Sequence, residues 1–166
     1  QALRLTPNNG MVLLNLASVE MRQGKYQAAT QLLQRLLQLE QSPRAYAGLG
    51  LAYFFQHRYE QAAVALESAI DLDPNQYAIW GNLGSVYRWT AEGKERSRLA
   101  FRRAIELAEK ELAMRPGDHR VRANLADYWA KLGDSRKSTA LIEAIPATAR
   151  RPYMTRIAIV YELAGQ

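Results

Sequence analysis

The sequence predicts an all-α solenoid built from stacked pairs of antiparallel helices. Its first indication is a Leu–Gly pair, Leu49–Gly50, that returns 34 residues later as Leu83–Gly84. Apolar residues also recur every three or four positions on both sides of these pairs, which is the period of a helix face. Glycines and prolines that end helices keep the same phase. A recurrence of this length is typical of repeat proteins in which each unit contributes one helical hairpin. Weaker versions of the pair occur at Leu16–Ala17, Leu125–Ala126 and Ile157–Ala158.

The clearest unit runs over residues 43–76. Its first half carries Tyr46, Leu49, Gly50 and Tyr53 at helical spacing, and its second half repeats the pattern from Tyr59 to Ile70. Asp73-Pro74-Asn75 then ends the second helix, because the residue before a proline is biased away from the α region. Two helices joined by a short turn form an antiparallel hairpin.

Small side chains explain the strict spacing of this unit. Gly50 and Ala62 fall where the two helix backbones should cross, and Ala69 falls where the next hairpin should dock. Larger side chains there would force the helices apart.

These residues resemble the tetratricopeptide repeat (TPR), whose 34-residue signature is an aromatic residue, Leu-Gly, Tyr, Ala, a large apolar residue, Ala and Pro. The resemblance implies a right-handed superhelix whose first helices line a concave groove. We expect one TPR array over residues 1–166, with about four full repeats and a half-repeat at each end. The expected division is 1–9 (tail of a preceding repeat), 10–42, 43–76, 77–118, 119–150 and 151–166 (first helix of a fifth repeat).

Departures from the ideal unit occur on both sides of it. The unit 77–118 contains eight extra residues and has Glu111 where the family has Ala, so we expect a longer, shifted second helix. Gly24 and Gly133 fall in hairpin turns, where glycine adopts positive φ at little cost, and His57 takes the same place in the unit 43–76. Both ends look like half-units, and we expect the natural protein to be longer.

Composition limits the function. With 48% apolar and 23% charged residues the chain can bury a core, and it has no run of eighteen apolar residues and no signal-peptide pattern. Location stays open, with the cytoplasm as the default. The chain lacks cysteine and has two isolated histidines, His57 and His119, without a catalytic or metal-binding motif. We therefore expect no enzyme activity, no metal and no cofactor.

The resemblance places the candidate binding residues on the first helices. Asn15, Asn82 and Asn124 each stand directly before a Leu, and a row of amides could bind the backbone of an extended peptide. Asparagine is also common at this place in the family, and Gly48 breaks the row. The peptide-binding candidates are Asn15, Arg22, Arg44, Phe55, Asn82, Arg88, Trp89, Arg120, Asn124, Lys131 and Arg156.

Basic residues outnumber acidic ones along these helices, and the net charge of the whole chain is +6. An acidic peptide or helix is therefore the expected partner, although a solvated charged face would give the same pattern. The extra residues of 77–118 add a basic ridge that could contact an acidic domain or phosphate groups, or could simply be solvated. This ridge comprises Lys94, Arg96, Arg98, Arg102 and Arg103.

The sequence thus favours a non-catalytic protein–protein interaction scaffold. A loose resemblance to TPR arrays of bacterial signalling proteins leaves a second interpretation open, a regulatory segment of a Ser/Thr kinase or transcriptional regulator. Nucleic-acid binding through the basic ridge is a weaker third one, because the groove positions vary between repeats whereas RNA-reading repeats need matched polar sets.

Overall fold

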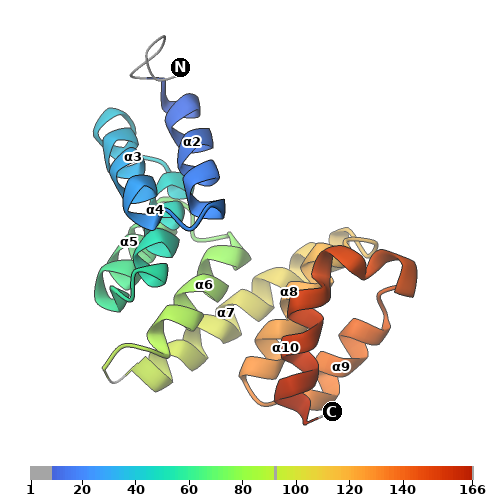
Figure 1. Ribbon diagram of the computed structural model, residues 1–166. Helices are drawn as coiled ribbons and strands as arrows, with labels where there is room; N and C mark the ends of the chain where they lie inside the picture. Colours follow the sequence, from blue (N-terminus) through green and yellow to red (C-terminus); the bar gives the residue numbers. More distant parts are fainter. Residues whose placement is uncertain (1–8, 92, 166) are drawn as a thin grey trace. The chain divides into compact units, whose positions relative to one another are not determined.

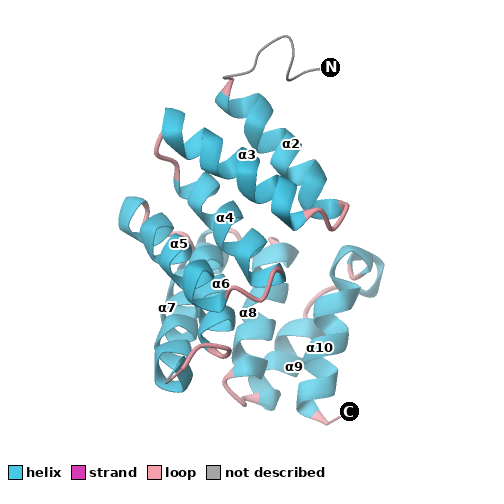
Figure 2. Cartoon of the chain, turned by 60° about the vertical axis from the view of Figure 1, so that its left-hand side comes forward, coloured by secondary structure: helices cyan, strands magenta, loops and turns pink. Residues whose placement is uncertain are grey.

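The computed structural model describes residues 9–91 and 93–165, and within them the chain forms nine α-helices and two short 3-10 helices, with no strand (Figures 1 and 2). Consecutive α-helices pair as hairpins, which confirms the all-α prediction. The expected tail at 1–9 lies almost entirely outside the described residues. The elements are α2 (Gly10–Arg22), α3 (Tyr26–Leu39), α4 (Pro43–Phe55), α5 (Tyr59–Leu72), α6 (Tyr77–Tyr87), α7 (Gly93–Met114), α8 (His119–Lys131), α9 (Ser135–Glu143), η1 (Ala147–Ala149), η2 (Arg151–Tyr153) and α10 (Met154–Ala164).

The chain divides into two compact units. The first comprises residues 1–75 and 85–93, and the second comprises residues 76–84 and 94–166. The first unit therefore contains the α2–α3 and α4–α5 hairpins, and the second contains α7 to α10 with the beginning of α6.

The α4–α5 hairpin shows why a glycine is needed at its crossing. A Cβ atom on Gly50 would lie 2.6 Å from Cγ of Leu66 and 3.1 Å from the backbone oxygen of Ala62. Ala62, Leu66 and Ala69 have no exposed surface. The two backbones therefore approach at Gly50 and Ala62, as the spacing predicts, and the bulk of Leu66 fills the space beside them.

Three hairpin turns share one backbone conformation. Gly24 and Gly133 have φ values of 75° and 87°, and His57 has a φ of 60° at the corresponding turn between α4 and α5. His57 holds this left-handed conformation without glycine's freedom, and its Nδ1 lies 2.8 Å from the hydroxyl of Tyr59. The turn positions expected from the sequence are thus confirmed.

The second unit is organised around a long helix. Helix α7 has 22 residues, whereas α5 has 14, so the longer second helix expected from the insertion is present. Its buried residues Phe101 and Ala104 pack with Leu125 of α8. The Ser97 hydroxyl donates to the backbone oxygen of Gly84 at 2.7 Å, which ties α7 to α6.

A further cluster in the second unit joins α8, α9 and α10. Ala126 of α8, Ile142 of α9 and Val160 of α10 are buried together. Two 3-10 turns connect α9 to α10, and the Arg150 guanidinium supports the connection by donating to the backbone oxygens of Ile145 and Glu143. Helix α10 therefore packs on α8 and gives that first helix a neighbour.

No helix among the described residues has both the length and the apolar character needed to cross a bilayer.

Candidate interaction surfaces

The three asparagines before Leu differ in exposure. Asn15 is exposed and Asn82 is half-buried, whereas Asn124 is only 5% exposed. The Asn124 amide donates to the Tyr77 hydroxyl at 3.2 Å. The expectation of a repeated free amide needs correction here, because Asn124 uses its amide within the protein.

Tyr77 links Asn124 to Arg120. The Arg120 guanidinium donates to the same hydroxyl at 2.8 Å and lies 3.6 Å from a carboxylate oxygen of Asp118 and 3.9 Å from one of Glu111. Burial raises the pKa of the Tyr77 phenol, so the hydroxyl stays neutral and serves as a hydrogen-bond centre. Arg120 is exposed, but part of its charge is already compensated.

Lys131 and Arg156 line one cavity of about 400 Å³ in the second unit, together with Asp127. The Lys131 ammonium forms an ion pair with Oδ2 of Asp127 at 2.9 Å. Oδ1 of Asp127 is buried and has no hydrogen-bond partner. The sequence predicts Lys131 and Arg156 as groove residues, and the structure adds that Lys131 is largely buried and paired with Asp127. The other residues lining the cavity are Pro152, Tyr153, Thr155 and Ile159.

The aromatic candidates in the first unit rest on tyrosines of second helices. Phe55 stacks on Tyr26 with ring centroids 4.9 Å apart, and Trp89 stacks on Tyr59 at 5.6 Å. Phe55 is still 47% exposed and Trp89 is 61% exposed. Each ring is therefore held on one side and open to a ligand on the other. Phe54 lies between Phe55 and Tyr59, so it packs within the protein.

The arginines of the first helices in the first unit are exposed. Arg22 lies at the end of α2, Arg44 at the start of α4, and Arg88 directly after α6. Among the ion pairs of the described residues, none involves these three side chains.

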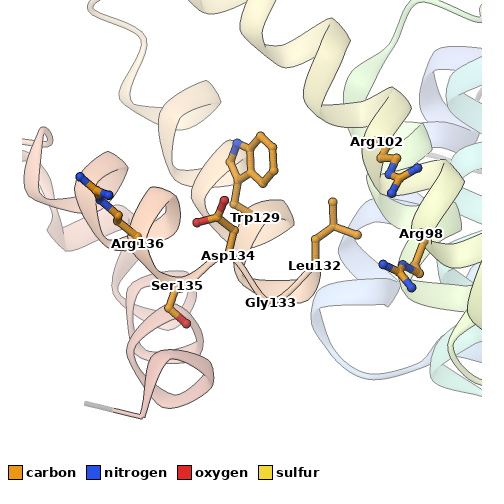
Figure 3. Close-up of a pocket in the computed structure, with 8 residues that line it drawn as sticks. All are labelled: Arg98, Arg102, Trp129, Leu132, Gly133, Asp134, Ser135 and Arg136. Carbon is orange, nitrogen blue, oxygen red and sulfur yellow. The ribbon is translucent and has the colours of Figure 1, made fainter.

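The basic ridge divides into parts with different surroundings. Arg103 donates to Glu106 at 2.7 Å, and Lys110 binds the other oxygen of the same carboxylate. The hydrogen bonds from Lys110 and Arg103 lower the pKa of Glu106. Arg98 and Arg102 instead line a cavity of about 560 Å³ (Figure 3). Lys94 and Arg96 are exposed on the first turn of α7 and do not line it.

Two family models match the first part of the chain. Both describe the tetratricopeptide repeat, one over residues 43–76 and the other over residues 1–48. Residues 1–76 therefore consist of tetratricopeptide repeats. A comparison with curated protein sequences found no significant match.

Solved structures, two of them of TPR proteins, share the fold. TTC0263, a thermophilic TPR protein of Thermus thermophilus, is 19% identical with a TM-score of 0.69, over 95% of this chain and 84% of that one. The Sgt2 TPR domain from Aspergillus fumigatus is 20% identical with a TM-score of 0.60, over 77% and 82%. An O-GlcNAc transferase mutant from Thermobaculum terrenum is 28% identical with a TM-score of 0.59, over 80% of this chain and 24% of that one.

Two features of this TPR chain go beyond the sequence prediction. Tyr26 and Tyr59 support Phe55 and Trp89, and the spacing of 33 residues between the two tyrosines indicates that they hold equivalent positions in the repeats. The bond between Tyr77 and Asn124 joins positions 47 residues apart and left no local signal.

No group of three or more His, Asp, Glu or Cys side chains suited to a metal ion occurs among the residues that the structure describes.

Proposed function

We propose that this TPR chain is a non-catalytic scaffold that binds an acidic protein segment on the exposed surface of its first helices. The TPR fold is generally a protein-interaction module, and that coarser assignment follows from the family matches. The observation that supports an acidic ligand is the presence of exposed arginines without an ion-pair partner among the described residues. Arg22 and Arg44 are the clearest, because each lies on a first helix.

The exposed aromatic rings support the same proposal. Phe55 and Trp89 offer flat apolar surface in the same unit as Arg22 and Arg44, and stacking on tyrosines reduces the entropy that these rings would lose on binding. A ligand with carboxylates beside apolar side chains would use both kinds of contact. The exposed Asn15 and half-buried Asn82 amides could add backbone contacts.

Charge reversal tests this proposal. A library of acidic peptides, with a matched library carrying Gln for Glu, is screened for binding, and the selected peptide is titrated by fluorescence polarisation. The Arg22→Glu/Arg44→Glu variant should weaken binding at least tenfold. The control Lys110→Glu/Arg115→Glu makes the same charge change on and directly after the second helix α7 and should have less than a threefold effect. Equal losses in both variants would show a general charge effect and would refute the proposal.

A second candidate is a regulatory segment of a larger bacterial signalling protein. In its favour, the similar part of the O-GlcNAc transferase covers only 24% of that enzyme, so arrays like this one occur within larger chains. Expression of the complete gene product, with and without residues 1–166, would test it by comparing any kinase or DNA-binding activity of the two forms.

A further inference from the structure

The cavity of about 560 Å³ in the second unit is built by three neighbouring segments (Figure 3). Helix α7 contributes Arg98 and Arg102, which lie one helical turn apart. The end of α8 and the following turn contribute Trp129, Leu132, Gly133 and Asp134, and the start of α9 contributes Ser135 and Arg136.

The lining of this cavity is positively charged. Three arginines and one aspartate leave a formal charge of +2. The aspartate is engaged elsewhere, since Oδ1 of Asp134 accepts from the backbone N–H of Lys137 at 3.0 Å and Oδ2 lies 3.6 Å from the Lys137 ammonium. None of the three guanidinium groups has an ion-pair partner among the described residues. The cavity therefore matches a ligand with about two negative charges.

An apolar surface separates the charges. In Figure 3, Arg98 and Arg102 lie on one side and Arg136 lies on the other. Leu132 and Trp129 stand between them, together with Asp134, whose carboxylate is bound to Lys137. The Trp129 ring is held in place by the Lys137 ammonium, 3.7 Å from the ring centroid. A ligand that fits this order carries an apolar group between two anionic ones.

We propose that this cavity binds an acidic segment of a protein partner in which an aliphatic or aromatic side chain lies between acidic residues. Guanidinium groups bind carboxylates in bidentate geometry, and Trp129 with Leu132 provides the contact for the central side chain. The site shares no residue with the first-helix surface proposed above and would give the scaffold a second contact.

The structure favours a peptide over nucleic acid at this position. A nucleic-acid backbone needs a continuous row of cations, and the affinity grows with the number of phosphates neutralised. The basic ridge is not continuous, because Arg103 is bound to Glu106 directly beside Arg102. The apolar centre of the cavity, formed by Leu132 and Trp129, also offers no group that binds a phosphate.

Peptide titration tests the site. The probe is a fluorescent ten-residue peptide with one glutamate on each side of a central phenylalanine, and its controls carry Gln for Glu or Gly for Phe. Binding is measured at physiological salt by fluorescence polarisation. The Trp129 indole N–H is followed in parallel by NMR and assigned with a Trp129→Phe variant. We expect saturable binding that shifts this resonance and is at least fivefold weaker for either control peptide.

Variants locate the contact. Arg98→Gln/Arg102→Gln should weaken binding at least tenfold and Arg136→Gln at least threefold. The matched control Lys94→Gln/Arg115→Gln removes two exposed cations at the two ends of α7, outside the cavity, and should change the affinity less than twofold. The first-helix variant Arg22→Glu/Arg44→Glu should leave this binding unchanged, so the two surfaces can fail independently.

Three outcomes would overturn the proposal. The first is no peptide binding at millimolar concentration, and the second is equal weakening by the cavity variants and their control. The third is a Trp129 shift with single-stranded RNA of ten nucleotides but not with the peptide, which would assign the cavity to nucleic acid.

Discussion

Helices α2 and α8 are first helices of the same length, one in each unit, and they differ sharply in how their polar residues are used. Both have 13 residues and both place an asparagine before a leucine. Asn15 of α2 is exposed, whereas Asn124 of α8 is buried and bonded to Tyr77. Equivalent positions in a repeat therefore do not present equivalent surfaces.

The same contrast continues along the two helices. Ser18 and Arg22 of α2 are exposed, and the Ser18 hydroxyl only bonds back to its own helix. The matching residues of α8, Asp127 and Lys131, form an ion pair with 8% and 18% of their side chains exposed. Helix α10 packs on α8 and lowers its exposure. Neighbouring helices, rather than repeat position, therefore decide which polar groups remain available.

The largest expected effect concerns the Asp127–Lys131 pair. Lys131→Met leaves the buried Asp127 carboxylate without its ion-pair partner and should lower the free energy of unfolding by about 3 kcal/mol. The matched change Arg22→Met on exposed α2 should stay within about 0.5 kcal/mol. Urea unfolding followed by circular dichroism measures both. Similar losses in the two variants would mean that the helices do not differ in the way described.

Next in size is the buried amide. Asn124→Ala removes a buried hydrogen bond to the Tyr77 hydroxyl, which keeps only the one from Arg120, and should cost about 1 kcal/mol of stability. Asn15→Ala should cost less than about 0.5 kcal/mol, since water replaces the exposed amide. The same urea titrations measure both variants. If Asn124→Ala left the free energy of unfolding unchanged, the Asn124 amide would contribute no more than a solvated one.

The helix starts provide a smaller, pH-dependent contrast. Asp118 caps α8 by accepting from the backbone N–H groups of Arg120 and Val121, both at 3.0 Å, and Asn9 caps α2 by accepting from that of Val12 at 3.2 Å. The hydrogen bond from Val121 lowers the pKa of Asp118. The ionised cap therefore stabilises the fold fully above the unfolded-state pKa of about 4, and this contribution is lost as the pH falls through the lowered folded-state value.

Asp118→Asn should remove this dependence. Between about pH 5 and pH 3 the unmodified chain should lose up to about 1 kcal/mol more stability than the variant. Asn9→Asp should add a similar acid-sensitive contribution to α2, whose first turn has no acidic residue. Thermal unfolding across this pH range measures the differences. Parallel curves for Asp118→Asn and the unmodified chain would contradict the expected role of the charge.

The smallest effect concerns the turns, where α2 and α8 agree and α4 differs. The first two end before a glycine with positive φ, and α4 ends before His57. His57→Gly should raise the free energy of unfolding by about 0.5 kcal/mol, as relief of backbone strain exceeds loss of the Tyr59 contact. His57→Ala loses that contact but keeps the strain, and should be slightly destabilising. Differential scanning calorimetry measures both, and no gain from glycine would show that the turn is unstrained.

Local pattern determined the helical hairpins of this protein. The positions of Gly50 and Ala62 at a crossing, the positive φ at Gly24 and Gly133, and a lengthened α7 all follow from residues close to one another along the chain. Such features are readable because helix periodicity and turn conformation depend on neighbouring residues. The groove and ridge assignments remain predictions, since residue type at a repeat position does not show what covers it.

Only the tertiary structure decided which candidates are available to a partner. It buried Asn124 against Tyr77, stacked Phe55 on Tyr26, and joined Arg98 and Arg102 to Trp129 and Arg136 around one cavity. Each of these contacts brings together residues that lie 25 or more positions apart in the sequence. Their approach depends on how successive helices pack. Sequence alone thus determined the repeating frame, and long-range packing determined which side chains that frame leaves exposed.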